Sequence, residues 1–193
     1  MSKRNLARIA VFSGSNFGRG EDYRAAAAEL GREIARRKME IVYGGTHKGL
    51  MGVVADSALA AGGSVHGVIT ERLLGKGHLH PGLTSHEVSA HMRARKARMA
   101  DCADAFVALP GGIGTLEELA EIWTLNQLGD MDKPLGLLDT AGYWRPFMGF
   151  IDHMIAEGFL PGAHRGSIVV EADPSRMIEA LAAAEAITVP KWM

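Results

Sequence analysis

The sequence predicts an α/β fold: a doubly wound, mostly parallel, Rossmann-like sheet with helices on both faces. Short apolar runs of the β type alternate with longer helical runs, and glycines gather directly after several of the apolar runs. Strands that are apolar throughout, such as residues 9–12, are typical of a parallel sheet covered on both faces. The 193 residues contain no repeat, low-complexity tract or linker, so we expect a single domain spanning residues 1–193.

The expected elements follow from hydrophobic period and from turn residues. The expected strands are residues 9–12, 40–43, 65–69, 105–109, 135–138 and 168–170. The expected helices are residues 21–37, 50–61, 91–102, 114–128, 143–157 and 174–184. Residues 71–85 contain glycine, histidine and proline and are expected to be irregular, and residues 188–193 are expected to form a loose tail.

The composition indicates a cytoplasmic protein with neither nucleic acid nor membrane as a partner. Lys plus Arg number 21 and Asp plus Glu number 22, so no overall charge attracts a polyanion. Cys102 is the single cysteine, which excludes an intrachain disulfide. The apolar run after the basic start ends at Phe12, too soon for a signal segment, and no run approaches the length of a membrane helix.

Three glycine turns follow expected strands: Ser13-Gly14-Ser15, Gly44-Gly45 and Pro110-Gly111-Gly112. Ligands of open α/β sheets bind beyond the carboxyl ends of the strands. The third turn leads straight into a helix through Gly114 and Thr115, so free N–H groups and the helix dipole would point at a bound phosphate. The alternative is a tight structural turn in which Thr115 caps the helix and Glu118 completes a capping box.

The third turn matches neither familiar nucleotide loop. It lacks the Gly-Lys-Ser/Thr of a Walker loop, and Glu117 stands where a dinucleotide fingerprint has its third glycine. Glu118 places a carboxylate close to the phosphate cradle, which is useful only if the ligand develops positive charge nearby. Upstream, a helix carries four cations, which form either a solvated face or an anion-facing one. These cations are Arg93, Arg95, Lys96 and Arg98.

Other reactive residues give weaker signals. His86 and His91 are five residues apart and do not share a helix face, and His78 and His80 lack a third ligand, so we expect surface histidines and no metal. Cys102 is expected to be a small buried residue. No lysine stands out as a pyridoxal phosphate ligand, so no cofactor is expected. In the helix after the cradle we expect Leu119 and Ile122 in the core. Trp123 is expected either at a dimer interface or against a base.

The chain resembles the LOG ("Lonely Guy") family, whose members are often mislabelled lysine decarboxylases. The resemblance rests on Met92-x-x-Arg95-Lys96 followed by Pro110-Gly111-Gly112-Ile113-Gly114-Thr115-Leu116-Glu117-Glu118. It extends over nearly the whole chain, through segments that include residues 11–15, 42–45, 49–52, 127–129, 133–138 and 157–159. The resemblance implies a doubly wound sheet, a homodimer and a phosphoribohydrolase. Such enzymes hydrolyse the N-glycosidic bond of a nucleoside 5′-monophosphate to free base and ribose 5-phosphate, without a cofactor.

The resemblance also implies roles for particular residues. Arg95 and Glu118 match the catalytic pair. The matched substrate-binding positions are Glu71, Lys96, Gly111, Gly112, Ile113, Gly114, Thr115, Leu116, Glu117 and Thr124. Within that set the 5′-phosphate would lie on Gly111, Gly112, Gly114 and Thr115, with Lys96 or Arg98 assisting. Glu118 would stabilise an oxocarbenium-like ribosyl centre and orient or activate water, while Arg95 positions Glu118 or the ribose.

The sequence leaves two questions open: which base the substrate carries, and whether the chain is an enzyme or a non-catalytic binding module. The sequence departs from the common family pattern at Arg93-Ala94, Thr46-His47-Lys48, Trp123 and Asn126, positions that we place at the pocket rim. Both AMP and a prenylated adenine nucleotide therefore remain as substrates. The rival is a non-catalytic nucleotide-binding or molybdenum-cofactor carrier module on the same scaffold, which would not need Arg95 and Glu118 as a pair.

Overall fold

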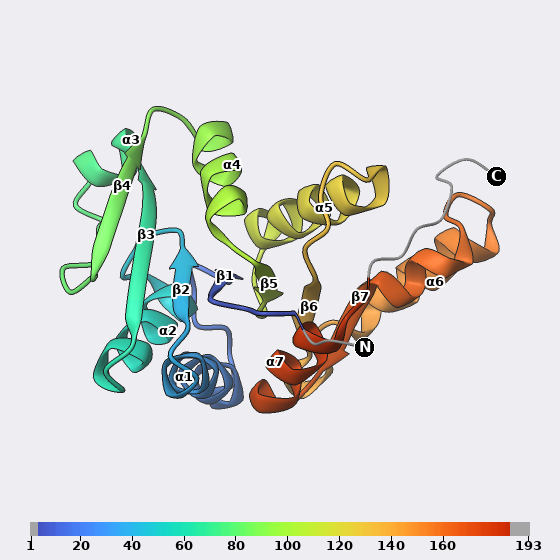
Figure 1. The fold of residues 1–193 in the computed structure, drawn as a ribbon, viewed down its shortest axis with the longest axis horizontal. Helices are drawn as coiled ribbons and strands as arrows, with labels where there is room; N and C mark the ends of the chain where they lie inside the picture. Colours follow the sequence, from blue (N-terminus) through green and yellow to red (C-terminus); the bar gives the residue numbers. More distant parts are fainter. Residues whose placement is uncertain (1–3, 186–193) are drawn as a thin grey trace.

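The computed structural model describes residues 4–185. Seven parallel strands form one sheet in the order β4-β3-β2-β1-β5-β6-β7 (Figure 1). The strands are β1 (Arg8–Phe12), β2 (Glu40–Tyr43), β3 (Ser64–Thr70), β4 (Ser85–Ser89), β5 (Ala105–Ala108), β6 (Leu135–Leu138) and β7 (Ile168–Glu171). The strand order reverses between β1 and β5, and the expected doubly wound parallel sheet is confirmed.

Seven α-helices and two 3-10 turns connect the strands in this part of the chain. The helices are α1 (Glu21–Arg36), α2 (Gly49–Ala60), α3 (Glu71–Gly75), α4 (Met92–Cys102), α5 (Ile113–Leu128), α6 (Arg145–Ala156) and α7 (Pro174–Ala183). The 3-10 turns are η1 (Thr140–Gly142) and η2 (Gly162–Ser167). None of the helices between residues 4 and 185 combines the length and the apolar character needed to cross a bilayer.

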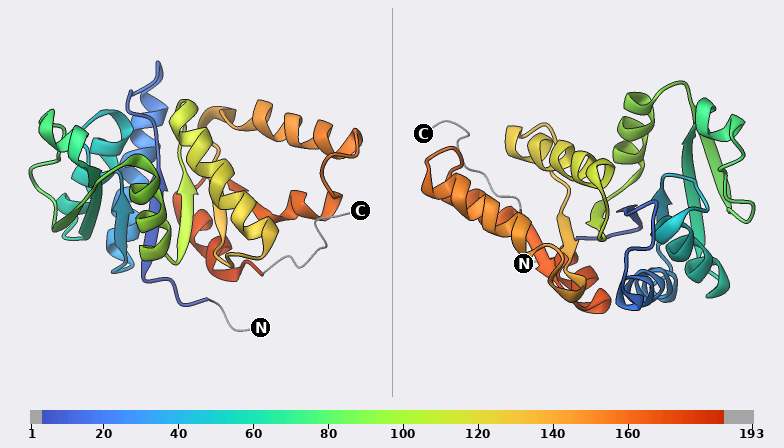
Figure 2. Two further views of the ribbon diagram at one scale, coloured as in Figure 1. Left: turned by 90° about the horizontal axis from the view of Figure 1, so that it is seen from above. Right: turned by 180° about the vertical axis from the view of Figure 1, so that it is seen from behind.

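Alternation along the strands produces two cores, one on each face of the sheet. Ile9 and Val11 of β1 face one layer with α1, α2 and α7, whereas Ala10 and Phe12 face the other layer with α4, α5 and α6 (Figures 1 and 2). Successive strand side chains point to opposite faces, so a strand that is buried on both sides must be apolar throughout. The positions of the central strands were therefore predicted correctly from the uninterrupted apolar runs.

The stretch expected to be irregular is instead partly regular. It contains α3, and β4 begins at its last residue and pairs with β3 at the edge of the sheet. The sequence of β4, Ser-His-Glu-Val-Ser, is mostly polar and alternates between exposed and half-buried positions. An edge strand of this kind lacks the apolar run on which the prediction depended. The expected loose tail at residues 188–193 lies outside the described residues.

The helix starts that differ from expectation include those of α6 and α4. Residues 143 and 144 lie between η1 and α6, which begins at Arg145 with Pro146 in its first turn. Helix α4 begins at Met92 because His91 is its N-cap, and the His91 ring accepts a hydrogen bond of 3.1 Å from the N–H of Ala94. Both starts follow local capping rather than the hydrophobic period.

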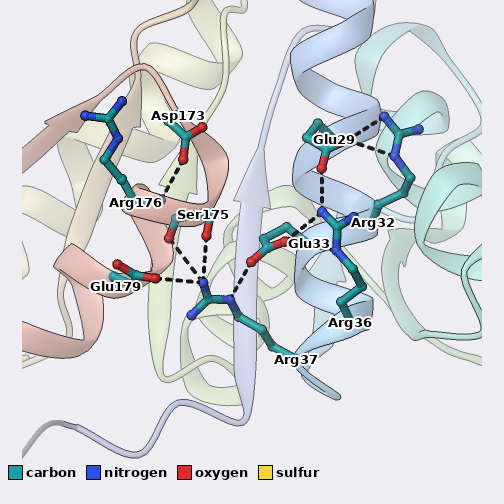
Figure 3. A network of polar contacts seen from close by, with 9 residues as sticks. All are labelled: Glu29, Arg32, Glu33, Arg36, Arg37, Asp173, Ser175, Arg176 and Glu179. Carbon is teal, nitrogen blue, oxygen red and sulfur yellow. Dashed lines mark hydrogen bonds and ion pairs between the residues drawn. The ribbon is translucent and has the colours of Figure 1, made fainter.

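A network of ion pairs joins α1 to α7 across the layer that they share (Figure 3). Arg37, the C-cap of α1, donates from Nε to Glu33 at 2.7 Å. Its Nη2 donates to the Ser175 hydroxyl at 2.8 Å and to Glu179 at 3.2 Å, both on α7. Arg36 adds a second cation beside Glu33 at 2.7 Å. The network links a helix from the first half of the chain to the last helix.

Candidate active site

The amino end of α5 lies directly after the loop that follows β5 and is open to solvent. The helix has Gly112 as its N-cap, and no side chain in residues 4–185 caps it. Ile113, its first residue, is 81 % exposed, and Gly112 and Gly114 are exposed as well. The first N–H groups of a helix have no acceptor within the helix. This end therefore presents free donors and the positive end of the helix dipole to an anion.

The capping-box alternative for this turn is wrong. Thr115 is not the N-cap but lies within the first turn of α5, where its side chain is buried. Its hydroxyl lies so close to Gly111 that a Cβ at that position would overlap it. Gly111 is therefore required for close approach of the loop to the helix. The sequence predicted the strand, loop and helix correctly but placed the start of the helix one residue late.

The loops after β1 and β5 meet where the strand order reverses. Gly14 N–H donates to the Pro110 carbonyl at 3.0 Å, which joins the two loops. Beside them lies a pocket of about 200 Å³. Its walls include Phe17, Tyr23 and Tyr143, which the sequence did not single out. The Tyr143 hydroxyl also donates to the Gly111 carbonyl, so it holds the phosphate loop from the pocket side.

Arg95 and Glu118 form a buried ion pair between α4 and α5. Arg95 Nη1 donates to Glu118 Oε1 at 3.2 Å, and the two side chains are only 6 % and 14 % exposed. The Arg95 guanidinium is held on two further sides, because Nε donates to the Val68 carbonyl at 2.8 Å and Nη1 lies 3.2 Å from Met92 Sδ. A Cβ on Gly44 would overlap Nη2. The second glycine turn thus leaves space for this arginine.

Burial sets the acidity of Glu118. Removal from water raises the pKa of the Glu118 carboxyl, and the charge and hydrogen bond of Arg95 lower it by less, so the pKa lies above its usual value. Among the described residues only Arg95 donates to this carboxylate, and only to Oε1. Oε2 is left for a substrate group or a water molecule. The site therefore places one positioned carboxylate in a largely dry environment about one helical turn from the anion cradle.

Lys96 lies next to Arg95 but has different partners. Its Nζ contacts Glu117 and lies 2.8 Å from Glu121, both on α5. Burial lowers the pKa of Lys96, but the hydrogen bonds to Glu117 and Glu121 together raise it by more, so the amine stays protonated. In this structure its charge is directed at carboxylates rather than at the cradle.

The remaining predicted substrate residues are spread over the rim of the site. Leu116 is half-buried in α5 against the core. Glu71 begins α3 and is exposed at the carboxyl end of β3, where no hydrogen bond or ion pair within residues 4–185 joins it to Arg95 or Glu118. Thr124 is exposed on α5, and its hydroxyl donates to the Ala120 carbonyl at 2.7 Å. Their roles stay predictions.

Several neighbouring residues have partners that the sequence did not predict. Arg98 makes two hydrogen bonds of 2.7 and 2.8 Å to Glu87 on β4, and its assistance at the cradle stays a prediction. Trp123 packs on the core of its own chain and donates to the Ser167 hydroxyl at 2.7 Å. Asn126 bonds the backbone of Lys133. Trp123 and Asn126 therefore each make a structural contact within the chain, and their place at a pocket rim stays a prediction.

The histidine and cysteine expectations had mixed outcomes. His86 and His91 are exposed as expected, but His80 and His164 are buried. His80 Nε2 lies 2.9 Å from an Asp56 carboxylate oxygen, which accounts for its burial. Cys102, Leu119 and Ile122 are buried, as predicted. The sequence could not separate buried from exposed histidines because their partners lie far away in the chain.

Comparisons with known proteins match this geometry to a family. The family model described as "Possible lysine decarboxylase" matches residues 51–181. A cytokinin riboside 5′-monophosphate phosphoribohydrolase of Rhodococcoides fascians is 44 % identical over 174 residues, which cover 90 % of this chain and 88 % of that protein. The Arabidopsis thaliana enzyme LOG3, of the same description, is 41 % identical over 181 residues, covering 94 % and 84 %.

The chain belongs to the LOG family. Solved structures with similar folds include the molybdenum cofactor carrier protein of Chlamydomonas reinhardtii, at 24 % identity and a TM-score of 0.70, covering 93 % of this chain and all of that one. The molybdenum cofactor binding protein of Rippkaea orientalis is 21 % identical with a TM-score of 0.70, covering 93 % and 97 %. At this identity the likeness concerns the fold alone. The LOG relatives, by contrast, match this chain in sequence over most of its length.

Proposed function

We propose that this chain hydrolyses the N-glycosidic bond of an adenine or N6-substituted adenine nucleoside 5′-monophosphate, releasing the base and ribose 5-phosphate. Membership of the LOG family supports the reaction class. The observation that carries the proposal is the Arg95–Glu118 pair, a buried, oriented carboxylate next to an uncapped helix end. A site that only binds phosphate needs no such carboxylate, because the negative charge of the carboxylate would repel the phosphate.

The proposed reaction assigns each part of the site a step. The 5′-phosphate binds the free N–H groups of the Gly111–Thr115 loop. As the bond between C1′ and the base breaks, positive charge develops on the ribose, and Glu118 stabilises it across a short, poorly solvated distance. Glu118 also orients the water whose oxygen bonds to C1′. One proton of that water leaves with the base, and Arg95 holds the carboxylate in place throughout.

Lysine decarboxylation, which the family description names, fits this site poorly. That chemistry needs an uncharged lysine amine to form an imine with a cofactor. Lys96, the lysine nearest the Arg95–Glu118 pair in sequence, bonds two carboxylates that keep it protonated. A protonated amine is not a nucleophile. The proposed hydrolysis uses no cofactor.

We also propose that Glu71, Lys96 and Thr124 contact the substrate and that the protein works as a cytoplasmic homodimer. The resemblance to LOG enzymes supports both proposals. Apolar side chains that remain exposed on α5 and around α6 give a surface for a second copy to cover: Ile113, Leu128, Phe150 and Phe159. Light scattering should give the mass of two chains, and a single-chain mass at micromolar concentration would exclude the dimer.

The direct test is incubation of the protein with AMP and with a prenylated adenine nucleotide. Chromatography for free base, combined with an assay for ribose 5-phosphate, should detect both products in equal amounts. Glu118→Gln serves as the matched control, because it keeps the shape and one hydrogen-bond acceptor. Tight nucleotide binding without base release by the unaltered protein would instead favour the carrier module.

A further inference from the structure

A second cluster of chemically reactive side chains lies away from the cradle, where α4 packs on the edge of the sheet. His66 of β3, Glu87 of β4 and Cys102 of α4 each offer one ligand atom, and these atoms lie within 4.8 Å of one another. Cys102 is seven residues, or about two helical turns, beyond Arg95. The proposed hydrolysis uses none of the three.

The His66 ring is held as a metal-binding histidine usually is. Its Nδ1 lies 2.7 Å from the Ser85 hydroxyl, which fixes the ring from behind. Its Nε2 is buried, has no hydrogen-bond partner in residues 4–185, and lies 3.4 Å from Glu87 Oε1. A ligating histidine commonly bonds a neighbour through its other ring nitrogen. The side chain is only 12 % exposed, so the unpartnered nitrogen is shielded from water.

Cys102 and Glu87 are the other two potential metal ligands. Cys102 offers a soft sulfur donor and Glu87 a hard oxygen donor. Cys102 is buried and free. Glu87 bonds Arg98, whose side chain is 47 % exposed and can turn toward solvent. The charged groups that influence the thiol from neighbouring elements are Arg8, Arg98, Glu87 and Asp101. Arg8 itself is paired with Glu40 at 2.8 Å, so its charge is largely offset.

We propose that His66, Glu87 and Cys102 form a binding site for a borderline-soft divalent cation of the Zn²⁺ class. One nitrogen, one oxygen and one sulfur match the donors that zinc accepts, and water would occupy the fourth position. Bond lengths of about 2.0–2.3 Å in a tetrahedron put ligand atoms about 3.3–3.8 Å apart. The cluster therefore has to contract by about an ångström, which rotamer changes of Glu87 and Cys102 allow.

Binding has a defined proton and charge balance. The Cys102 thiol loses its proton when the cation enters, and Arg98 releases one or both oxygens of Glu87. The site ties α4 to β3 and β4, because each element supplies one ligand. Metal binding should therefore stabilise the part of α4 that lies between Arg95 and the metal ligand.

The test uses Co²⁺ as a spectroscopic probe for Zn²⁺ on the intact chain. We expect one Co²⁺ per chain and a thiolate-to-cobalt charge-transfer band, which Zn²⁺ abolishes by displacement. Cys102 is the only cysteine in the sequence, so the band can come from no other thiol. Cys102→Ser should lose the band, and His66→Asn should weaken binding by at least about tenfold. Arg98→Gln should strengthen binding, because it frees Glu87 and removes a nearby cation.

His86→Asn is the matched control, since His86 is exposed on β4 directly beside Glu87 and should leave the affinity unchanged. Glu87→Gln tests the site with little risk to the fold, because Glu87 is 39 % exposed. Circular dichroism checks that each variant is folded. Absence of the thiolate band in the unaltered protein, or equal Co²⁺ affinity of His66→Asn and His86→Asn, would overturn the proposal.

Discussion

Two ion pairs join α4 to α5 side by side, yet their surroundings give them different properties. Arg95 and Glu118 are both shielded from water, whereas in the neighbouring pair Lys96 is shielded, at 13 % exposed, but Glu117 is 54 % exposed. Water weakens the attraction and screens the charges of the outer pair. The inner pair keeps its electrostatic strength, and the pKa of Glu118 is raised by burial. Consecutive residues thus supply one pair that is shielded from water and one pair that is partly exposed.

The largest effect should come from removing the charge of the inner carboxylate. Glu118→Gln should lower kcat at least about a hundredfold, because the ribosyl cation loses its counter-charge, while nucleotide binding persists. Glu117→Gln, the matched change in the outer pair, should keep turnover within about threefold. Single-turnover rates and nucleotide affinities measure both effects. Near-normal turnover of Glu118→Gln would remove that residue from the mechanism.

The second-largest effect should be on the pH dependence of kcat, which the pKa of Glu118 controls. The raised pKa of Glu118 places the acid limb of the kcat profile above the usual range for glutamate, about 4.3. Activity falls with falling pH as the carboxylate becomes protonated. Arg95→Met removes the group that does most to lower this pKa, so the acid limb should move to higher pH.

Lys96→Met is the comparison for that shift. Lys96 also lowers the pKa of Glu118, but by less than Arg95 does, so its removal should move the acid limb in the same direction by a smaller amount. A pH profile of Arg95→Met that matches the unaltered protein would mean that Arg95 does not set the acidity of Glu118. The profiles should be recorded with saturating nucleotide, so that changes in affinity do not distort them.

A smaller effect is expected from the outer pair on substrate binding. We propose that Lys96 turns from Glu117 and Glu121 to the substrate phosphate, so Lys96→Met should raise KM by about three- to tenfold and change kcat by less. Initial rates over a range of nucleotide concentrations separate the two parameters. An unchanged KM would limit Lys96 to its ion pairs with α5.

The smallest effect lies in the α1–α7 network, far from both pairs. Hydrogen bonds from Arg37 and Arg36 outweigh burial and hold the pKa of Glu33 below its usual value. This stabilisation is present above the unfolded pKa of about 4.3 and is lost as pH falls through the lower folded value. Glu33→Gln should therefore cost about 1 kcal/mol or less near pH 7. Urea unfolding at neutral and at acidic pH measures the cost. A cost that stays constant down to about pH 3 would contradict the linkage.

The sequence predicted most of the central sheet and the components of the site, for reasons visible in single elements. The apolar runs of β1, β2 and β5 are buried on both faces, so burial alone determined their position. The edge strand β4 and the short α3 carry no such pattern and were missed. Arg95 and Glu118 were paired only through the family motif, because 23 residues separate them and no local pattern connects them.

Other features depend on contacts between residues that are far apart in the sequence, and no local sequence pattern predicts them. The role of Gly44 is visible only once Arg95 lies against it. Tyr143 reaches Gly111 from a turn after β6, and the partners of His66 come from two other elements. The contact of Arg98 with Glu87 was not predicted for the same reason, because β4 itself was not expected.

The open end of α5 links catalysis to inhibition by the product. A helix that begins at a glycine without a side-chain cap is less stable than a capped one by roughly a few tenths of a kcal/mol, and any bound phosphate offsets that cost. Ribose 5-phosphate carries the same group as the substrate, so the product should compete with the nucleotide for these N–H groups. Turnover in the cell would then depend on how fast ribose 5-phosphate is consumed elsewhere.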